Sequence, residues 1–182
     1  FGADFKMTKD DLTIEFVNSE VYDSEGNLLC TLNGNEKRKL VSLEQMPEYL
    51  PKAYVAIEDE RFYEHSGVDI KRTGAATVTY VLHGGKSSFG GSTITQQLVK
   101  NITDDDEDSA LRKVKEMARA IQVEKEISKD DILELYLNII FVGGNNINGV
   151  ELGAEYYFNK DVSQVTIAEA AFMAGINHTP NS

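Results

Sequence analysis

The segment AIEDERFYEHSGVD, residues 56–69, places groups that can move protons beside aromatic rings. It holds five carboxylates, one arginine and one histidine around Phe62 and Tyr63. If the segment is helical, Glu58 lies one turn before Phe62, and a carboxylate against a ring can have the raised pKa of a general base. The alternative is that the rings are core residues and the carboxylates form a solvated face.

The segment GGSTITQQLVKN, residues 90–101, has the composition of an anion site. A diglycine leads into hydroxyl side chains and then into a helix, whose first backbone N–H groups lack partners within the helix. Gln97 and Lys100 are three residues apart and place an amide and a cation on one side. The alternative is that Gln96 caps the helix and Lys100 is a surface lysine.

The segment 109–126 is predicted to be the longest helix. Its apolar residues recur at spacings of three and four and predict a stripe that faces the core: Leu111, Val114, Ala118 and Ile121. Arg112, Lys113 and Glu116 share another face of this helix. They could be ordinary surface ion pairs, but exposed pairs contribute only about 0.3–0.5 kcal/mol each, so stability does not require them.

Composition restricts the function classes. The chain has 182 residues, 41% of them hydrophobic and 26% charged, as expected of one globular domain or one domain with a small second lobe. A net charge of −12 argues against nucleic acid as a partner. The single cysteine, Cys30, excludes an internal disulfide, and no HExxH or paired CxxC motif indicates zinc.

The remaining patterns predict a mainly α domain. Residues 21–32 predict a β-hairpin that turns at 25–27, and helical periods fill most of the chain from Pro47 to Gly175. Segment 83–92 is a candidate lid, and 103–108 reads as an acidic loop. Three helix starts carry capping-box patterns: Thr93 with Gln96, Ser128 with Asp131, and Thr166 with Glu169.

A carboxylate near rings, an anion site with a lysine and a second carboxylate among cations suit group transfer from an anionic leaving group. In this order, these segments resemble the motifs of the family 51 peptidoglycan glycosyltransferases, found in class A penicillin-binding proteins and monofunctional relatives. The resemblance covers about residues 21–178, and the motifs are EDERFYEHSGVD, GGSTITQQLVKN, RKVKE (112–116), KDDILELYLN (129–138) and GAEYYFNKDVSQVTIAEAAFMAG (153–175).

The resemblance implies a mainly α, lysozyme-like fold with a small N-terminal β-hairpin. Residues 1–20 would be a segment that follows a membrane anchor, and 21–182 the glycosyltransferase domain with a head lobe and a smaller, membrane-facing jaw lobe. The substrate would be lipid II, polymerised into β-1,4-linked glycan with inversion and release of undecaprenyl pyrophosphate. The expected location is the extracytoplasmic face of a bacterial cell membrane.

The family's functional residues map onto matching positions. Glu58 would be the general base and Glu116 the second carboxylate that assists departure of pyrophosphate. The resemblance assigns the substrate-binding positions as follows: Lys100, Arg112 and Lys113 to pyrophosphate, Ser92 and Gln97 to the donor sugar and phosphate, and Phe62 to the wall beside Glu58.

The resemblance also implies partners and cofactors. No cofactor is obligatory, with Mg²⁺ or Mn²⁺ as an optional assistant. The partners would be lipid II, the glycan strand, the membrane surface, a fused transpeptidase domain or division and elongation proteins, and a moenomycin-type inhibitor. Three positions depart from the family pattern: Asp108 replaces an arginine, Phe141 a tyrosine and Asn159 a glycine.

Two other functions remain open at this point. A lysozyme-like lytic glycosidase could use the two glutamates on finished glycan. It would not need Lys100, Arg112 and Lys113. A non-catalytic domain could bind lipid II alone, but it would not need both glutamates.

Overall fold

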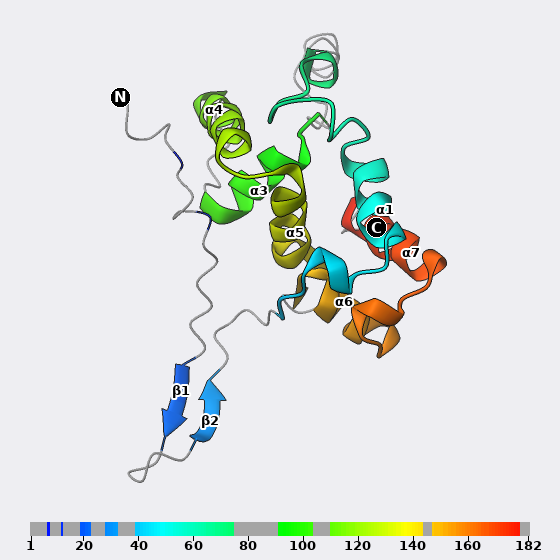
Figure 1. Ribbon diagram of the computed structural model, residues 1–182. Helices are drawn as coiled ribbons and strands as arrows, with labels where there is room; N and C mark the ends of the chain where they lie inside the picture. The colour runs from blue at the N-terminus through cyan, green and yellow to red at the C-terminus, as the bar shows by residue number, and fades with distance from the viewer. Residues whose placement is uncertain are drawn as a thin grey trace.

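The structure is a computed structural model that describes residues 7, 12, 19–22, 28–32, 39–74, 91–103, 110–143 and 147–178. The fold is mainly α, as the sequence predicts (Figure 1). The helices are α1 (Tyr49–Glu58), α3 (Ile94–Thr103), α4 (Ala110–Glu126), α5 (Lys129–Ile139), α6 (Val150–Phe158) and α7 (Ile167–His178), with short 3₁₀ turns η3 (Leu43–Gln45) and η4 (Val162–Gln164).

In the described part of the chain, two short antiparallel hairpins accompany the helices. The predicted hairpin is confirmed as β1 (Ser19–Tyr22) and β2 (Leu28–Leu32), with an irregular register at Val21 and Tyr22. It is drawn apart from the helices in Figure 1. The second hairpin pairs β3 (Phe141–Gly143) with β4 (Ile147–Asn148) between α5 and α6.

All three predicted capping boxes are present. At the start of α3, the N–H of Gln96 donates to Thr93 Oγ1 and the N–H of Thr93 donates to Gln96 Oε1, both at 3.1 Å. Ser128 and Asp131 make the same exchange before α5, and Thr166 and Glu169 make it before α7. These caps satisfy backbone N–H groups that have no partner within the helix, so they set where each helix begins.

Helix α5 is at the centre of the core. Its residues Ile132, Leu133, Tyr136 and Leu137 are buried. Helix α3 packs against α4 and α5, and α1 packs against α7 (Figure 1). The other helices contribute these buried residues: Leu50 and Tyr54 from α1, Leu98 from α3, Ala120 and Val123 from α4, Val150 from α6, and Met173 from α7. This packing holds the segments predicted to do chemistry against one another.

The predicted core stripe of α4 is wrong. Leu111 and Val114 are 57% and 53% exposed, Ile121 is also exposed, and Ala118 is only half-buried. The buried side of the helix carries Glu116 and small apolar residues instead. Periodicity identified a helix with an apolar face, but it cannot tell whether protein covers that face.

The loop after α1 lies directly on α4. Gly67 has a φ of +91°, and a Cβ there would lie 2.6 Å from the carbonyl carbon and oxygen of Ala120. Only glycine tolerates both the backbone conformation and this approach. Asn159, the departure from the family's glycine, has φ 53° and ψ 44° at the end of α6, where asparagine is the usual substitute for glycine.

Two predictions fall mainly on other parts of the chain. The candidate lid lies outside the described residues except for 91 and 92, and the acidic loop lies outside them except for Thr103. Within the described ranges, no helix combines the length and apolar character needed to cross a bilayer.

Candidate active site

Glu58 is the last residue of α1 and is buried, with 6% of its surface exposed. The side-chain amide of Gln97 donates to Glu58 Oε2 at 2.9 Å, and the hydroxyl of Tyr136 donates to Gln97 Oε1 at 3.2 Å. The guanidinium of Arg72 donates to the backbone carbonyl of Glu58. Glu58 is thus held by an amide donor from α3, which the sequence expectation of an aromatic neighbour did not include.

Asp59 connects the end of α1 to the start of α3. It is fully buried, and its Oδ2 accepts from the N–H of Ile94 at 3.0 Å and lies 2.9 Å from Nε2 of His65. Lys129 lies 3.5 Å from the other ring nitrogen of His65 and donates to Glu124 at 2.7 Å. This buried network fixes the position of Glu58 relative to α3, because Asp59 follows Glu58 directly.

Phe62 is fully buried in the core. The Lys129 ammonium lies 4.4 Å from the centre of the Phe62 ring, and Tyr63 and His65 pack edge-to-face against it. Phe62 therefore packs in the core with Tyr63, His65 and Lys129, and these ring contacts do not include Glu58, beside which the wall was predicted.

Glu116 is the second buried carboxylate, at 5% exposure, and both of its oxygens accept hydrogen bonds. Oε1 accepts from the Gln96 amide at 3.2 Å and from Lys113, and Oε2 accepts from Arg112 at 3.0 Å. Lys113 also donates to the hydroxyl of Ser92 at 2.7 Å. The structure thus joins the predicted anion-site segment, through Ser92 and Gln96, to the second carboxylate and its cations on α4.

A small cavity beside Glu116 gathers the cations. It is lined by Lys100, Thr103, Arg112, Glu116 and Arg119. Lys100 comes from α3 and the other charged groups from α4, so two helices supply the positive charge. Arg119 was not among the residues predicted for the site, although its position three residues after Glu116 placed it on the same face.

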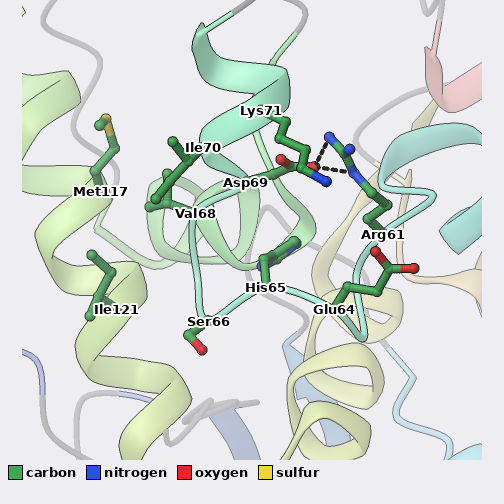
Figure 2. A pocket seen from close by; sticks show the side chains of 10 residues that line it. All are labelled: Arg61, Glu64, His65, Ser66, Val68, Asp69, Ile70, Lys71, Met117 and Ile121. Atoms are coloured by element: carbon green, nitrogen blue, oxygen red, sulfur yellow. Dashed lines mark hydrogen bonds and ion pairs between the residues drawn. The ribbon is translucent and has the colours of Figure 1, made fainter.

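A larger cavity of about 680 Å³ lies between the 61–71 segment and α4 (Figure 2). Val68 and Ile70 line one side, and Met117 and Ile121 of α4 face them. Its polar edge contains Arg61, Glu64, His65, Ser66, Asp69 and Lys71. Of these four apolar side chains, Ile121 was predicted to face the core, and the other three were not assigned to any surface.

Arg61 and Asp69 form an ion pair at the polar edge of this cavity (Figure 2), with Arg61 Nη2 and Nε at 2.6 and 2.8 Å from Asp69 Oδ2. Burial alone would raise the pKa of Asp69. The backbone N–H of Arg72 and the guanidinium of Arg61 outweigh that effect and hold the pKa below its ordinary value. Asp69 is therefore an ionised structural partner of Arg61.

The arrangement brings a carboxylate, amide donors and a group of fixed cations to the meeting point of α1, α3 and α4. A buried carboxylate in reach of a hydroxyl can accept a proton, and fixed cations stabilise negative charge that develops on a leaving group. Among the residues with described positions, no three or more His, Cys, Asp or Glu side chains gather as a metal site.

Comparison with known proteins gives consistent matches. A family model described as Transglycosylase matches residues 25–182. Penicillin-binding protein 1A of Clostridium botulinum (strain Langeland) is 46% identical over 166 residues, which cover 90% of this chain and 20% of that protein. Penicillin-binding protein 1F of Bacillus subtilis (strain 168) is 42% identical over 164 residues, covering 90% of this chain and 22% of that protein.

Penicillin-binding protein 1A of Clostridium perfringens (strain 13) is 45% identical over 167 residues, covering 90% of this chain and 24% of that protein. The chain thus spans about a fifth to a quarter of the length of these curated relatives.

Proposed function

The chain belongs to the transglycosylase family, the family 51 peptidoglycan glycosyltransferases that its motifs resemble, and we propose that it polymerises lipid II into β-1,4-linked glycan strands. The observation that carries the proposal is the pair of buried glutamates, Glu58 and Glu116, held by adjacent amides of α3, with Arg112 and Lys113 hydrogen-bonded to the second. One carboxylate is placed to accept a proton and the other to organise positive charge.

In the proposed reaction, Glu58 takes the proton of the acceptor's 4-hydroxyl group. The acceptor oxygen forms a bond to the anomeric carbon of the donor while the bond from that carbon to the pyrophosphate oxygen breaks, and the electron pair leaves with undecaprenyl pyrophosphate. Attack opposite the leaving group inverts the anomeric carbon. A positioned general base of this kind typically contributes about 10²- to 10⁴-fold in rate.

Glu116 acts through its cations in this proposal. Its oxygens accept from Arg112 and Lys113, so it fixes both cations where the departing pyrophosphate gains charge. Lys100 and Arg119, which share the cavity, extend the same positive surface. Ser92 and Gln97 would contact the donor sugar and phosphate, with Ser92 already bonded to Lys113.

We assign no obligatory cofactor. If Mg²⁺ or Mn²⁺ assists, it would bind with the pyrophosphate rather than at Glu116 alone, because hydrogen bonds from three side chains already occupy that carboxylate. Metal dependence is then expected to be partial, with the cations of α4 performing most of the charge stabilisation.

The proposal includes a membrane surface, since lipid II is anchored in a bilayer. Ile70, Leu111 and Val114 are 82%, 57% and 53% exposed, and Ile70 also lines the cavity of Figure 2. We assign this apolar surface of the 68–70 segment and α4 to contact with the extracytoplasmic face of the bacterial membrane, as the smaller lobe of a two-lobed domain.

The relatives' names add a wider context. Penicillin-binding proteins 1A and 1F are about four to five times as long as the matched region. We propose that the parent of this chain carries a transpeptidase domain and works with division or elongation proteins, and that a moenomycin-type phosphoglycolipid occupies the same site.

The test is incubation of the purified chain with labelled lipid II in detergent, with and without Mg²⁺ or Mn²⁺, followed by gel separation and muramidase digestion. We expect a ladder of digestible chains from the wild type and a loss of at least about 10²-fold in Glu58→Gln. Glu60→Gln changes an exposed neighbouring carboxylate and is the matched control that keeps activity. Substantial polymer from folded Glu58→Gln would remove Glu58 from the role of base.

The same assay separates the lytic alternative. A lytic glycosidase would cut finished glycan, leave lipid II unreacted, and keep its activity when Arg112 and Lys113 are replaced by alanine. Polymer formation that falls in these variants supports transfer from a pyrophosphate donor.

A further inference from the structure

Two neighbouring glutamines of α3 each hold one of the buried carboxylates. Gln97 donates from its amide nitrogen to Glu58 at 2.9 Å, and Gln96 donates from its amide nitrogen to Glu116 at 3.2 Å. Consecutive helical residues point about 100° apart, so one helix can reach α1 with one amide and α4 with the next.

Each amide is also fixed on its carbonyl side. Oε1 of Gln96 accepts from the backbone N–H of Thr93 at 3.1 Å, and Oε1 of Gln97 accepts from the hydroxyl of Tyr136 at 3.2 Å. A side-chain amide has a donor end and an acceptor end, and a partner for the acceptor end determines which end faces the carboxylate. In both cases the NH₂ group faces the glutamate.

We propose that Gln96 and Gln97 are positioning residues that orient Glu116 and Glu58, and that the buried hydroxyl of Tyr136 fixes the donor end of Gln97 toward Glu58. This inference deepens the proposed function and rests on it. Before binding substrate, Gln97 thus acts on the base itself. Contact with the donor sugar is not required for this role.

The physical reason is the effect of a donor on a carboxylate. A hydrogen bond donated to the ionised form favours it and lowers the pKa of the acid. If Tyr136 did not occupy Oε1, the amide could rotate and place its carbonyl oxygen against the Glu58 carboxylate, where two acceptors repel. Tyr136 is fully buried on α5, so its hydroxyl is a fixed reference for this orientation.

The experiment measures kcat/KM for lipid II polymerisation against pH in the wild type and in Gln97→Met, which keeps a side chain of similar length without the amide. We expect the acid side of the profile to move to higher pH in Gln97→Met, because the carboxylate of the base loses a hydrogen-bond donor. Activity well above that pH should largely recover, because the base is then ionised again.

Tyr136→Phe should move the acid side in the same direction by a smaller amount, since Gln97 remains but loses its fixed orientation. Tyr49→Phe is the matched control. Tyr49 is a half-buried tyrosine of α1 whose hydroxyl donates to the backbone carbonyl of Val165. Its profile should coincide with that of the wild type.

A second readout does not depend on turnover. In protein labelled with ¹³C at glutamate carboxyl carbons, the Glu58 signal is identified by its loss in Glu58→Gln, and its titration is followed by NMR. Gln97→Met should move this titration to higher pH than in the wild type. If Gln97→Met shifts this titration but the wild type does not polymerise lipid II, the positioning role is retained and the proposed function is rejected.

The inference is overturned if Gln97→Met lowers activity equally at every pH and leaves the Glu58 titration unchanged. That result would make Gln97 a substrate contact only. A Tyr136→Phe profile that coincides with the Tyr49→Phe profile would remove Tyr136 from the mechanism, because both variants lose one hydrogen-bonded hydroxyl and keep the ring.

Discussion

Lys100 is the exposed cation of the small cavity beside Glu116. If Lys100 binds pyrophosphate, Lys100→Ala should lower the affinity for a moenomycin-type phosphoglycolipid by at least about tenfold, because a hydrogen bond between charged groups is lost. Calorimetric titration measures the affinity. Lys125→Ala, which removes an exposed lysine near the end of α4, is the control. Equal affinities in both variants would count against the pyrophosphate role.

Asp69 gives the chain a defined response to acid. Its folded-state pKa is held below the ordinary value by Arg72 N–H and Arg61 against the effect of burial. A depressed pKa stabilises the fold above the unfolded-state pKa of about 4, and this stability is lost as pH falls through the folded-state pKa. Asp69→Asn should therefore lower the free energy of unfolding by about 1 kcal/mol at pH 7. The difference from the wild type should be smaller below about pH 4.

Denaturant unfolding at several pH values measures this difference. Glu48→Gln is a suitable comparison, because Glu48 also has a lowered pKa, caused by Lys52, but forms an exposed ion pair. Its effect should be near zero at every pH. A constant gap between wild type and Asp69→Asn from neutral to strongly acidic pH would disprove the linkage.

At the scale of elements, the start of α3 couples stability to the site. Thr93→Ala removes the cap that binds the Gln96 N–H, and it also removes the hydrogen bond from Thr93 Oγ1 to the Gly67 carbonyl at 2.7 Å. We expect a loss of about 1–2 kcal/mol in the free energy of unfolding and reduced polymerisation.

Thr166→Ala is the matched control for this cap. It deletes the same kind of capping box before α7, where the threonine is exposed. It should cost about 1 kcal/mol and leave polymerisation unchanged. Equal losses of activity in the two variants would mean that general stability, and not the start of α3, determines the rate.

Sequence patterns predicted the elements better than their contacts. Capping boxes and the bounds of α4 depend on neighbouring residues, so local rules found them. The bond from Gln97 to Glu58 spans 39 positions and the bond from Tyr136 to Gln97 another 39, and no local rule contains such pairs. The apolar face of α4 was assigned to the core because helical period reports amphipathicity and not what covers it.

At the scale of the molecule, the exposed apolar surface of the 68–70 segment and α4 should bind lipid. Combined Ile70→Ser, Leu111→Ser and Val114→Ser should lower partition onto phosphatidylcholine vesicles by at least about tenfold, since each buried apolar side chain contributes about 1.5–3 kcal/mol. Uncharged vesicles avoid repulsion from the net charge of −12. Vesicle flotation measures the bound fraction.

Ile167→Ser with Phe172→Ser controls for surface hydrophobicity in general. Both residues are exposed on α7, which lies on the opposite side of Figure 1 from α4. This pair should leave partition unchanged. If it lowers partition as much as the α4 variant, membrane contact is not localised to the surface that borders the cavity of Figure 2.

The adjacent positions of Gln96 and Gln97 have a consequence for how this chain tolerates insertions and deletions. One residue added between the Thr93 cap and Gln96 would turn both amides by about 100° around the axis of α3, so both glutamates would lose their amide donors from α3 at once. A point substitution at either glutamine affects one carboxylate. Insertions and deletions in the first turn of α3 should therefore be far less tolerated than single substitutions at either glutamine.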